Sequence, residues 1–218
     1  ESCGLLIDVK GKEKYYPCKN LSSYSQQCFI IDPKDYAKAE DSGKVLAVIH
    51  SHPVTPPVAS QADMISCEES GLIWHIVNPK TEQWGFYKPS GYKPPLIGRH
   101  WVWGITDCWS LVRDWYKEKL GITLRDWERP TTPEEFIENP MFEKCAWRTG
   151  FRQLRPEEKL ENGDLLFMSI MATGLNHVAI FLDGDVLHHL ADRISCKEPY
   201  NQWLFKCTGM RLRYAQES

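Results

Sequence analysis

The stretch KVLAVIHSHPVTPPVASQAD, residues 44–63, contains an apolar run, a proline-rich loop and a helix start within twenty positions. Its first seven residues, KVLAVIH, have the composition of a buried strand. Ser60 and Asp63, three positions apart, match the pattern of a helix cap. The sequence therefore predicts a strand over 44–50 that leads through a loop into a helix over 61–70.

The elements around this stretch indicate one α/β or α+β domain of about ninety residues. Asp32-Pro33 is a typical helix start, and Gly71 is a typical helix stop. The pattern predicts helices over 33–42 and 61–70 and strands over 3–9, 14–19, 27–31, 44–50, 72–77 and 83–87. The chain begins without methionine inside a strand pattern, so we expect this domain to be N-terminally truncated.

A second domain is predicted after the proline- and glycine-rich segment 87–99. It starts with an amphipathic helix, TDCWSLVRDWYKEKLG, capped by Thr106 or Asp107 and stopped by Gly121. Further helical pieces are predicted over 133–147 and strands over 164–170, 177–182, 185–190 and 209–214. The order of these elements favours an α+β fold. We therefore expect domains at 1–88 and 99–218, joined by a linker at 89–98.

Composition narrows the class of protein. The 218 residues are 42% hydrophobic with a net charge of -3, which indicates a folded core and gives no electrostatic signature of binding to nucleic acid. No window approaches 18 consecutive apolar residues, and no leader pattern opens the chain. We therefore expect no nucleic-acid partner and no membrane insertion, and nothing in the sequence indicates export. The eight scattered cysteines form no CxxC pair and are expected to be mostly reduced.

His50 and His52 suggest a metal site, because side chains two positions apart on a strand project from the same face. The alternative is a pair of strand-end histidines in solvent. Asp63 could be a third ligand, which would leave a fourth position for water, as in a catalytic zinc site. Glu1 is the candidate general base. Ser60 could cap the helix, stabilise an oxyanion, or do both.

This spacing, His50-Ser51-His52-Pro53 with Ser60, Asp63 and an upstream glutamate in ESCGLL, resembles the JAMM motif of JAB/MPN metallopeptidases. The resemblance implies one zinc ion per chain held by His50, His52 and Asp63, with water activated by Glu1. It also implies that Ser60 steadies the tetrahedral intermediate while a peptide or isopeptide bond is cut.

Cys108 begins the helix after the linker, where backbone N–H groups favour a thiolate. We therefore expect a pKa well below that of an ordinary thiol, although Cys108 could equally be a buried structural cysteine on the apolar face. His177 opens a later strand and is a candidate base.

The third member of this site, the group that orients the base, could be His188 or His189. Asp183-Gly184 predicts a two-residue type I′ turn between the strands that carry the histidines. That turn pairs residue 179 with 188 and puts His188 on the face of His177.

The segments GITDCWSLVRDWY, ENGDLLFM, NHVAIFL and VLHHL resemble the NlpC/P60 family of papain-like cysteine peptidases. The resemblance implies Cys108 as nucleophile, His177 as base and His188 as the orienting group. Trp101 stands where members of that family often have tyrosine. The implied substrates are peptidoglycan stem peptides.

The order of the two domains resembles the tail assembly (tail tip) proteins of lambda-like long-tailed phages. That resemblance implies other tail tip proteins as partners. It also implies a location in the virion tail, or in the host cytoplasm during assembly, with action at the bacterial cell wall. The leading hypothesis is a two-site hydrolase. The alternatives are a structural assembly factor with vestigial sites and a host enzyme of peptidoglycan recycling.

Overall fold

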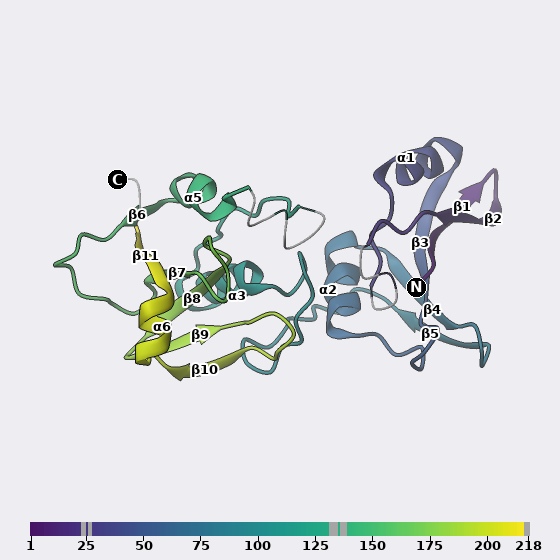
Figure 1. The fold of residues 1–218 in the computed structure, drawn as a ribbon. Coiled ribbons are helices and arrows are strands. Elements are labelled where there is room, and N and C mark those ends of the chain that lie inside the picture. Colours follow the sequence, from purple (N-terminus) through teal and green to yellow (C-terminus); the bar gives the residue numbers. More distant parts are fainter. Residues whose placement is uncertain (23–24, 26–27, 131–134, 136–138, 216–218) are drawn as a thin grey trace. The chain divides into compact units, whose positions relative to one another are not determined.

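The computed structural model describes residues 1–22, 25, 28–130, 135 and 139–215, and its chain divides into two compact units (Figure 1). These are Glu1–Pro94 and Pro95–Ser218. The division falls within the segment 89–98 that we predict as a linker, and the domain boundaries themselves stay predictions.

The first unit is built on a five-stranded sheet of order β2-β1-β3-β4-β5. Only β3 and β4 run parallel, because helix α2 crosses over between them. The strands are β1 Cys3–Val9, β2 Lys12–Cys18, β3 Lys44–Ser51, β4 Ile73–Asn78 and β5 Gln83–Tyr87, and the helices are α1 Pro33–Ser42 and α2 Gln61–Ser70. Leu5, Val48 and Trp74 are among the buried core residues.

The predicted strand at 27–31 is wrong. Among the described residues of this stretch, 28–31, Ile31 forms an isolated bridge with Asn20 and no strand is present. The Asn20 side chain explains this result, because it bonds the Cys28 carbonyl and the Ile30 N–H, at 3.1 and 3.0 Å. These side-chain hydrogen bonds occupy backbone groups that would otherwise pair with a neighbouring strand.

The second unit is built on an antiparallel six-stranded sheet of order β10-β9-β8-β7-β11-β6. The strands are β6 Phe151–Gln153, β7 Leu165–Met168, β8 His177–Leu182, β9 Asp185–His188, β10 Cys196–Pro199 and β11 Thr208–Tyr214. The main helices are α3 Cys108–Trp115, α5 Met141–Cys145 and α6 Gln202–Cys207. The mixed α+β class expected for the chain is confirmed.

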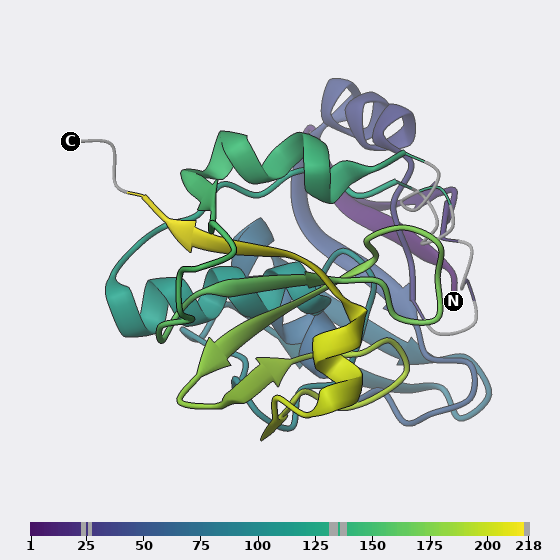
Figure 2. The ribbon, with the colours of Figure 1, turned by 60° about the vertical axis from the view of Figure 1, so that its left-hand side comes forward.

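Helices cover both faces of this second sheet. Val178 and Ile180 of β8 belong to the core that contains α3, whereas Ala179 packs with Leu204 of α6. Figure 2 shows α6 in front of the strands and α3 behind them. Residues alternate between the faces along β8, so each side chain of the strand has one of two environments.

Several elements of the second unit differ from expectation. The first helix continues beyond Trp115 as a π-helical turn, Tyr116–Leu120, before Gly121 ends it at a φ of 71°. Strands β6 and β10 and helix α6 have no predicted counterpart, because elements of three to six residues carry too little periodicity. Of the helical pieces predicted over 133–147, α5 is present and residues 133–134 and 136–138 lie outside the described residues. Among the described helices, none is long and apolar enough to cross a membrane.

Candidate functional sites

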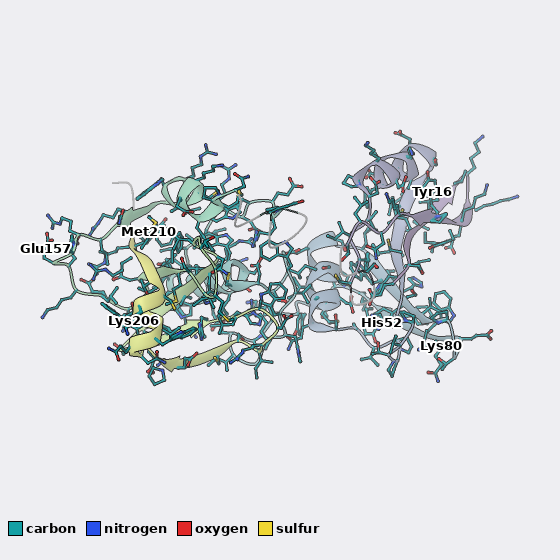
Figure 3. All side chains as sticks on the ribbon, viewed as in Figure 1. Tyr16, His52, Lys80, Glu157, Lys206 and Met210 are labelled. Atoms are coloured by element: carbon teal, nitrogen blue, oxygen red, sulfur yellow. The ribbon has the colours of Figure 1, made fainter. Side chains whose placement is uncertain are left out.

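A cluster of donor atoms lies in the first unit where β3 ends and α2 begins. His50 lies in β3, His52 directly follows it (labelled in Figure 3), and Asp63 is in the first turn of α2. The two Nε2 atoms are 3.1 Å apart. The carboxylate oxygens of Asp63 lie 3.3 Å from Nε2 of His50 and 3.4 Å from Nε2 of His52. The structure therefore brings together the three ligands predicted from the sequence.

These distances fit a tetrahedral metal ion. Ligand atoms about 2.0–2.1 Å from zinc are roughly 3.3 Å from one another at tetrahedral angles. The Nδ1 atom of His52 lies 3.1 Å from the carbonyl oxygen of Pro56, an arrangement that directs Nε2 into the cluster. Phe29 and Trp74 pack against the ring of His50, with centroids 4.6 and 5.4 Å away. The cluster is therefore compatible with a bound metal.

Asp63 is oriented by the cap of its own helix. The Ser60 N–H donates to Oδ2 of Asp63 at 2.7 Å, and Oγ of Ser60 accepts from the Asp63 N–H at 3.1 Å. Burial alone would raise the pKa of the Asp63 carboxyl, but hydrogen bonds with His50 and His52 outweigh burial and lower it. Asp63 is therefore an ionised, fixed carboxylate. The cap role of Ser60 is confirmed, and its role towards an oxyanion stays a prediction.

Glu1 also faces this cluster. Its Oε1 lies 3.8 Å from Nε2 of His52, and the donor atoms of Glu1, His50 and His52 all lie within 4.8 Å of one another. The Asn20 side chain bonds the Glu1 carbonyl at 3.0 Å, and Oγ of Ser51 accepts from the next backbone N–H. Burial raises the pKa of the Glu1 carboxyl, which suits a group that accepts a proton. Sequence reasoning missed the supporting residues, Asn20 and Ser51.

The second candidate site contains Cys108, the first residue of α3. Asp107 caps this helix, accepting from the Ser110 N–H at 2.8 Å, and pairs with Arg129 at 2.8 Å. A backbone N–H of Val178, the residue after His177, points to the thiol. The thiol therefore lies beside the start of β8.

The expected low pKa of Cys108 is wrong. Burial and the adjacent Asp107 carboxylate raise the pKa of the thiol to about 12, although backbone N–H groups act in the opposite direction. The loss of solvation outweighs the helix N-terminus, so Cys108 is a neutral thiol at neutral pH.

The histidines of the second site form a buried chain that ends on a carboxylate. Nε2 of His177 lies 3.2 Å from Nδ1 of His188, and Nε2 of His188 lies 2.7 Å from Oε1 of Glu198. Burial, together with His188 and His189, lowers the pKa of His177 well below its usual value. His177 is therefore neutral at rest.

The structure answers the choice between His188 and His189 as partner of His177. Asp183 and Gly184 have φ of 54° and 88°, as a type I′ turn requires, and residue 179 pairs with His188. The register argument and the contact between His177 and His188 are confirmed. His189 instead donates from Nε2 to the Arg193 carbonyl at 3.0 Å.

Glu198 is the site residue that sequence reasoning missed. It lies on β10 opposite Val186, so it is on the same face of the sheet as His188. The four-residue strand β10 shows no periodicity of its own that could have pointed to it.

Comparison with known proteins assigns a family model to each part of the chain. The sequence model of the NlpC/P60 family matches residues 98–212, and the model for prokaryotic homologs of the JAB domain matches residues 1–88. A solved structure from Staphylococcus aureus, described as similar to lipoprotein of the NLP/P60 family, is 21% identical with a TM-score of 0.37, over 56% of this chain and 38% of that one. The chain carries an NlpC/P60 domain after a JAB-like domain.

Two curated relatives match this chain over most of their length. Tail tip assembly protein K of Escherichia phage N15 is 34% identical over 221 residues, which cover 98% of this chain and 88% of the relative. Tail tip assembly protein K of Escherichia phage lambda is 32% identical, with coverages of 79% and 84%. This chain belongs to the family of tail tip assembly protein K.

Proposed function

We propose that this protein acts in phage tail tip assembly and also cleaves peptidoglycan stem peptides with Cys108. The observation that carries the peptidase activity is the buried chain from His177 through His188 to Glu198, beside a helix that begins with a cysteine. In this proposal Cys108 is the nucleophile, His177 the base and His188 the orienting group.

Glu198 determines which nitrogen of His177 is basic. As a carboxylate, Glu198 accepts the proton on Nε2 of His188, which leaves Nδ1 of His188 as an acceptor. Nε2 of His177 then donates to that Nδ1 atom, and Nδ1 of His177 is left unprotonated. Glu198 is thus a positioning residue that acts through two imidazoles.

The chemistry starts from a neutral thiol and a neutral imidazole. Nδ1 of His177 takes the thiol proton as the sulfur of Cys108 attacks the carbonyl carbon of the stem peptide. The tetrahedral intermediate collapses to a thioester, and the leaving amine takes the proton from His177. Water, deprotonated by the same nitrogen, hydrolyses the thioester and restores the thiol. The raised pKa of Cys108 makes the base indispensable.

We propose that the first unit holds one zinc ion on His50, His52 and Asp63, whose spacing supports tetrahedral ligation. Bound there, zinc would supply an activated water and a Lewis acid for cutting a peptide or isopeptide bond. Glu1, with its raised pKa, would accept the proton of that water. Ser60 would stabilise the developing oxyanion.

The family supports other tail tip proteins as partners, with a location in the virion tail or in the host cytoplasm during assembly. We keep the proposed domain limits of 1–88 and 99–218. The alternative is a structural assembly factor whose sites are inactive.

The test is digestion of purified peptidoglycan, with fragments analysed by mass spectrometry. We expect stem-peptide cleavage by the wild type, none by Cys108→Ser, and undiminished cleavage by a His50→Ala/His52→Ala double variant. Absence of cleavage by the folded wild type, or equal cleavage by Cys108→Ser, would contradict the peptidase and favour the structural alternative.

A further inference from the structure

We propose a second metal site in this protein, formed by His188, Cys196 and Glu198 at the β9–β10 edge of the second sheet and selective for zinc-like cations. One donor atom from each of these residues lies within 4.8 Å of the other two. The donor atoms of Glu1, His50 and His52 in the first unit also lie within 4.8 Å of one another. The proposal does not depend on either site being catalytic.

Strand pairing holds the three side chains together. Cys196 pairs directly with His188 across β9 and β10, and Glu198 pairs with Val186. Directly opposed residues, and residues two apart, share a face of a sheet, so all three side chains project from the same face. The ligands thus come from two adjacent strands, which limits the conformational entropy lost on binding.

The donor set indicates the class of cation. A thiolate, an imidazole and a carboxylate suit zinc or cobalt, whereas magnesium and calcium prefer oxygen ligands alone. Tetrahedral zinc would place these donors roughly 3.3–3.6 Å apart. The His188–Glu198 distance of 2.7 Å must therefore open slightly, while the Cys196 sulfur already lies within 4.8 Å of both other donor atoms. The Glu198 side chain is 40% exposed, which permits that movement and gives the cation a route from solvent.

Metal binding would reverse the hydrogen bond between the two histidines. A metal on Nε2 of neutral His188 requires the proton of that ring to be on Nδ1, where it donates to Nε2 of His177. His177 then carries its own proton on Nδ1, the nitrogen that the proposed peptidase needs free. The number of protons on the pair is unchanged, and the proton of Cys196 is released to solvent. On the proposed function, zinc at this site inhibits cleavage.

The test is cobalt titration of the metal-free chain carrying His50→Ala/His52→Ala, which removes the first cluster. We expect one equivalent to bind with a near-ultraviolet thiolate-to-cobalt band. Adding Cys196→Ser should abolish the band and weaken binding at least about tenfold. Cys207→Ser, at another half-buried cysteine of the same unit, should leave both unchanged. Circular dichroism confirms that each variant folds.

Two outcomes overturn the site: cobalt that binds without a thiolate band, or a band and affinity that survive Cys196→Ser. Failure of cobalt to bind the folded parent chain overturns it as well. A separate assay measures zinc inhibition of peptidoglycan cleavage, in which Cys196→Ser should be resistant. A wild type without cleavage activity would count against the proposed peptidase, while the cobalt result would still decide the metal site.

Discussion

At the scale of single residues, burial decides the chemistry of the second site. Cys108 and His177 are both shielded from water, and burial disfavours the charged form of each. The pair is therefore neutral at rest, unlike a preformed thiolate–imidazolium pair. In the proposed peptidase, proton transfer would then accompany nucleophilic attack rather than precede it.

Alkylation of Cys108 should show this neutral state. Because the pKa of the thiol is raised to about 12, its thiolate fraction is small at neutral pH and rises only in strongly alkaline solution. We expect iodoacetamide to label Cys108 more slowly than the half-buried Cys207 between pH 6 and pH 9, measured by mass spectrometry of peptides. Fastest labelling at Cys108 near pH 6 would mean that the helix N-terminus outweighs burial.

The two adjacent histidines should differ in their effect on activity. His188 contacts His177 directly, whereas His189 bonds the Arg193 carbonyl. We expect His188→Ala to lower kcat for stem-peptide cleavage by about 10²–10⁴-fold and His189→Ala to cost much less. Equal losses in both variants, each shown to be folded, would refute the assignment.

At the scale of elements, helix ends and tight turns place the site residues. The cap of α2 orients Asp63, and the cap of α3 puts Asp107 beside the thiol. The two-residue turn Asp183-Gly184 sets the register that brings His188 to His177. In each case a short local motif positions a residue that acts with partners distant in sequence.

Replacing the cap serine should separate stability from ligand placement. Ser60→Ala removes the Oγ acceptor and should cost about 1 kcal/mol of unfolding free energy, measured by urea denaturation. The Ser60 backbone N–H still donates to Asp63, so zinc affinity should change little. Ser60→Thr, which keeps a hydroxyl, is the control for stability. A large loss of zinc affinity in Ser60→Ala would show that the hydroxyl itself holds the ligand.

At the scale of the whole molecule, each candidate site is contained in one compact unit. The His50 cluster lies within Glu1–Pro94, and the Cys108 site lies within Pro95–Ser218. Each unit has its own sheet and its own buried core. Metal binding to the first cluster should therefore act on the stability of the first unit.

Calorimetry should show this separation in a metal-free chain that carries Cys196→Ser, which removes the metal site proposed in the second unit. Zinc at 100 times its dissociation constant should stabilise the first unit by about 2.7 kcal/mol, seen as an upward shift of one unfolding transition. In the His50→Ala/His52→Ala variant that transition should no longer shift. A single transition that moves equally in both proteins would contradict independent unfolding of the two units.

The sequence alone determined the features that depend on local chemistry. The spacing of His50, His52 and Asp63 predicted a cluster that the structure brings together, because strand periodicity and a helix cap need only neighbouring residues. The Asp183-Gly184 turn likewise predicted the pairing of His188, because the turn type sets the hairpin register.

Tertiary structure alone decided the properties that depend on distant neighbours. The pKa of Cys108 follows from how completely the surrounding core excludes water, which position at a helix start does not reveal. Glu198 reaches His188 only because a four-residue strand pairs beside β9, and so short a segment carries no periodicity of its own. Desolvation and cross-strand neighbours arise from long-range packing, so local sequence patterns cannot specify them.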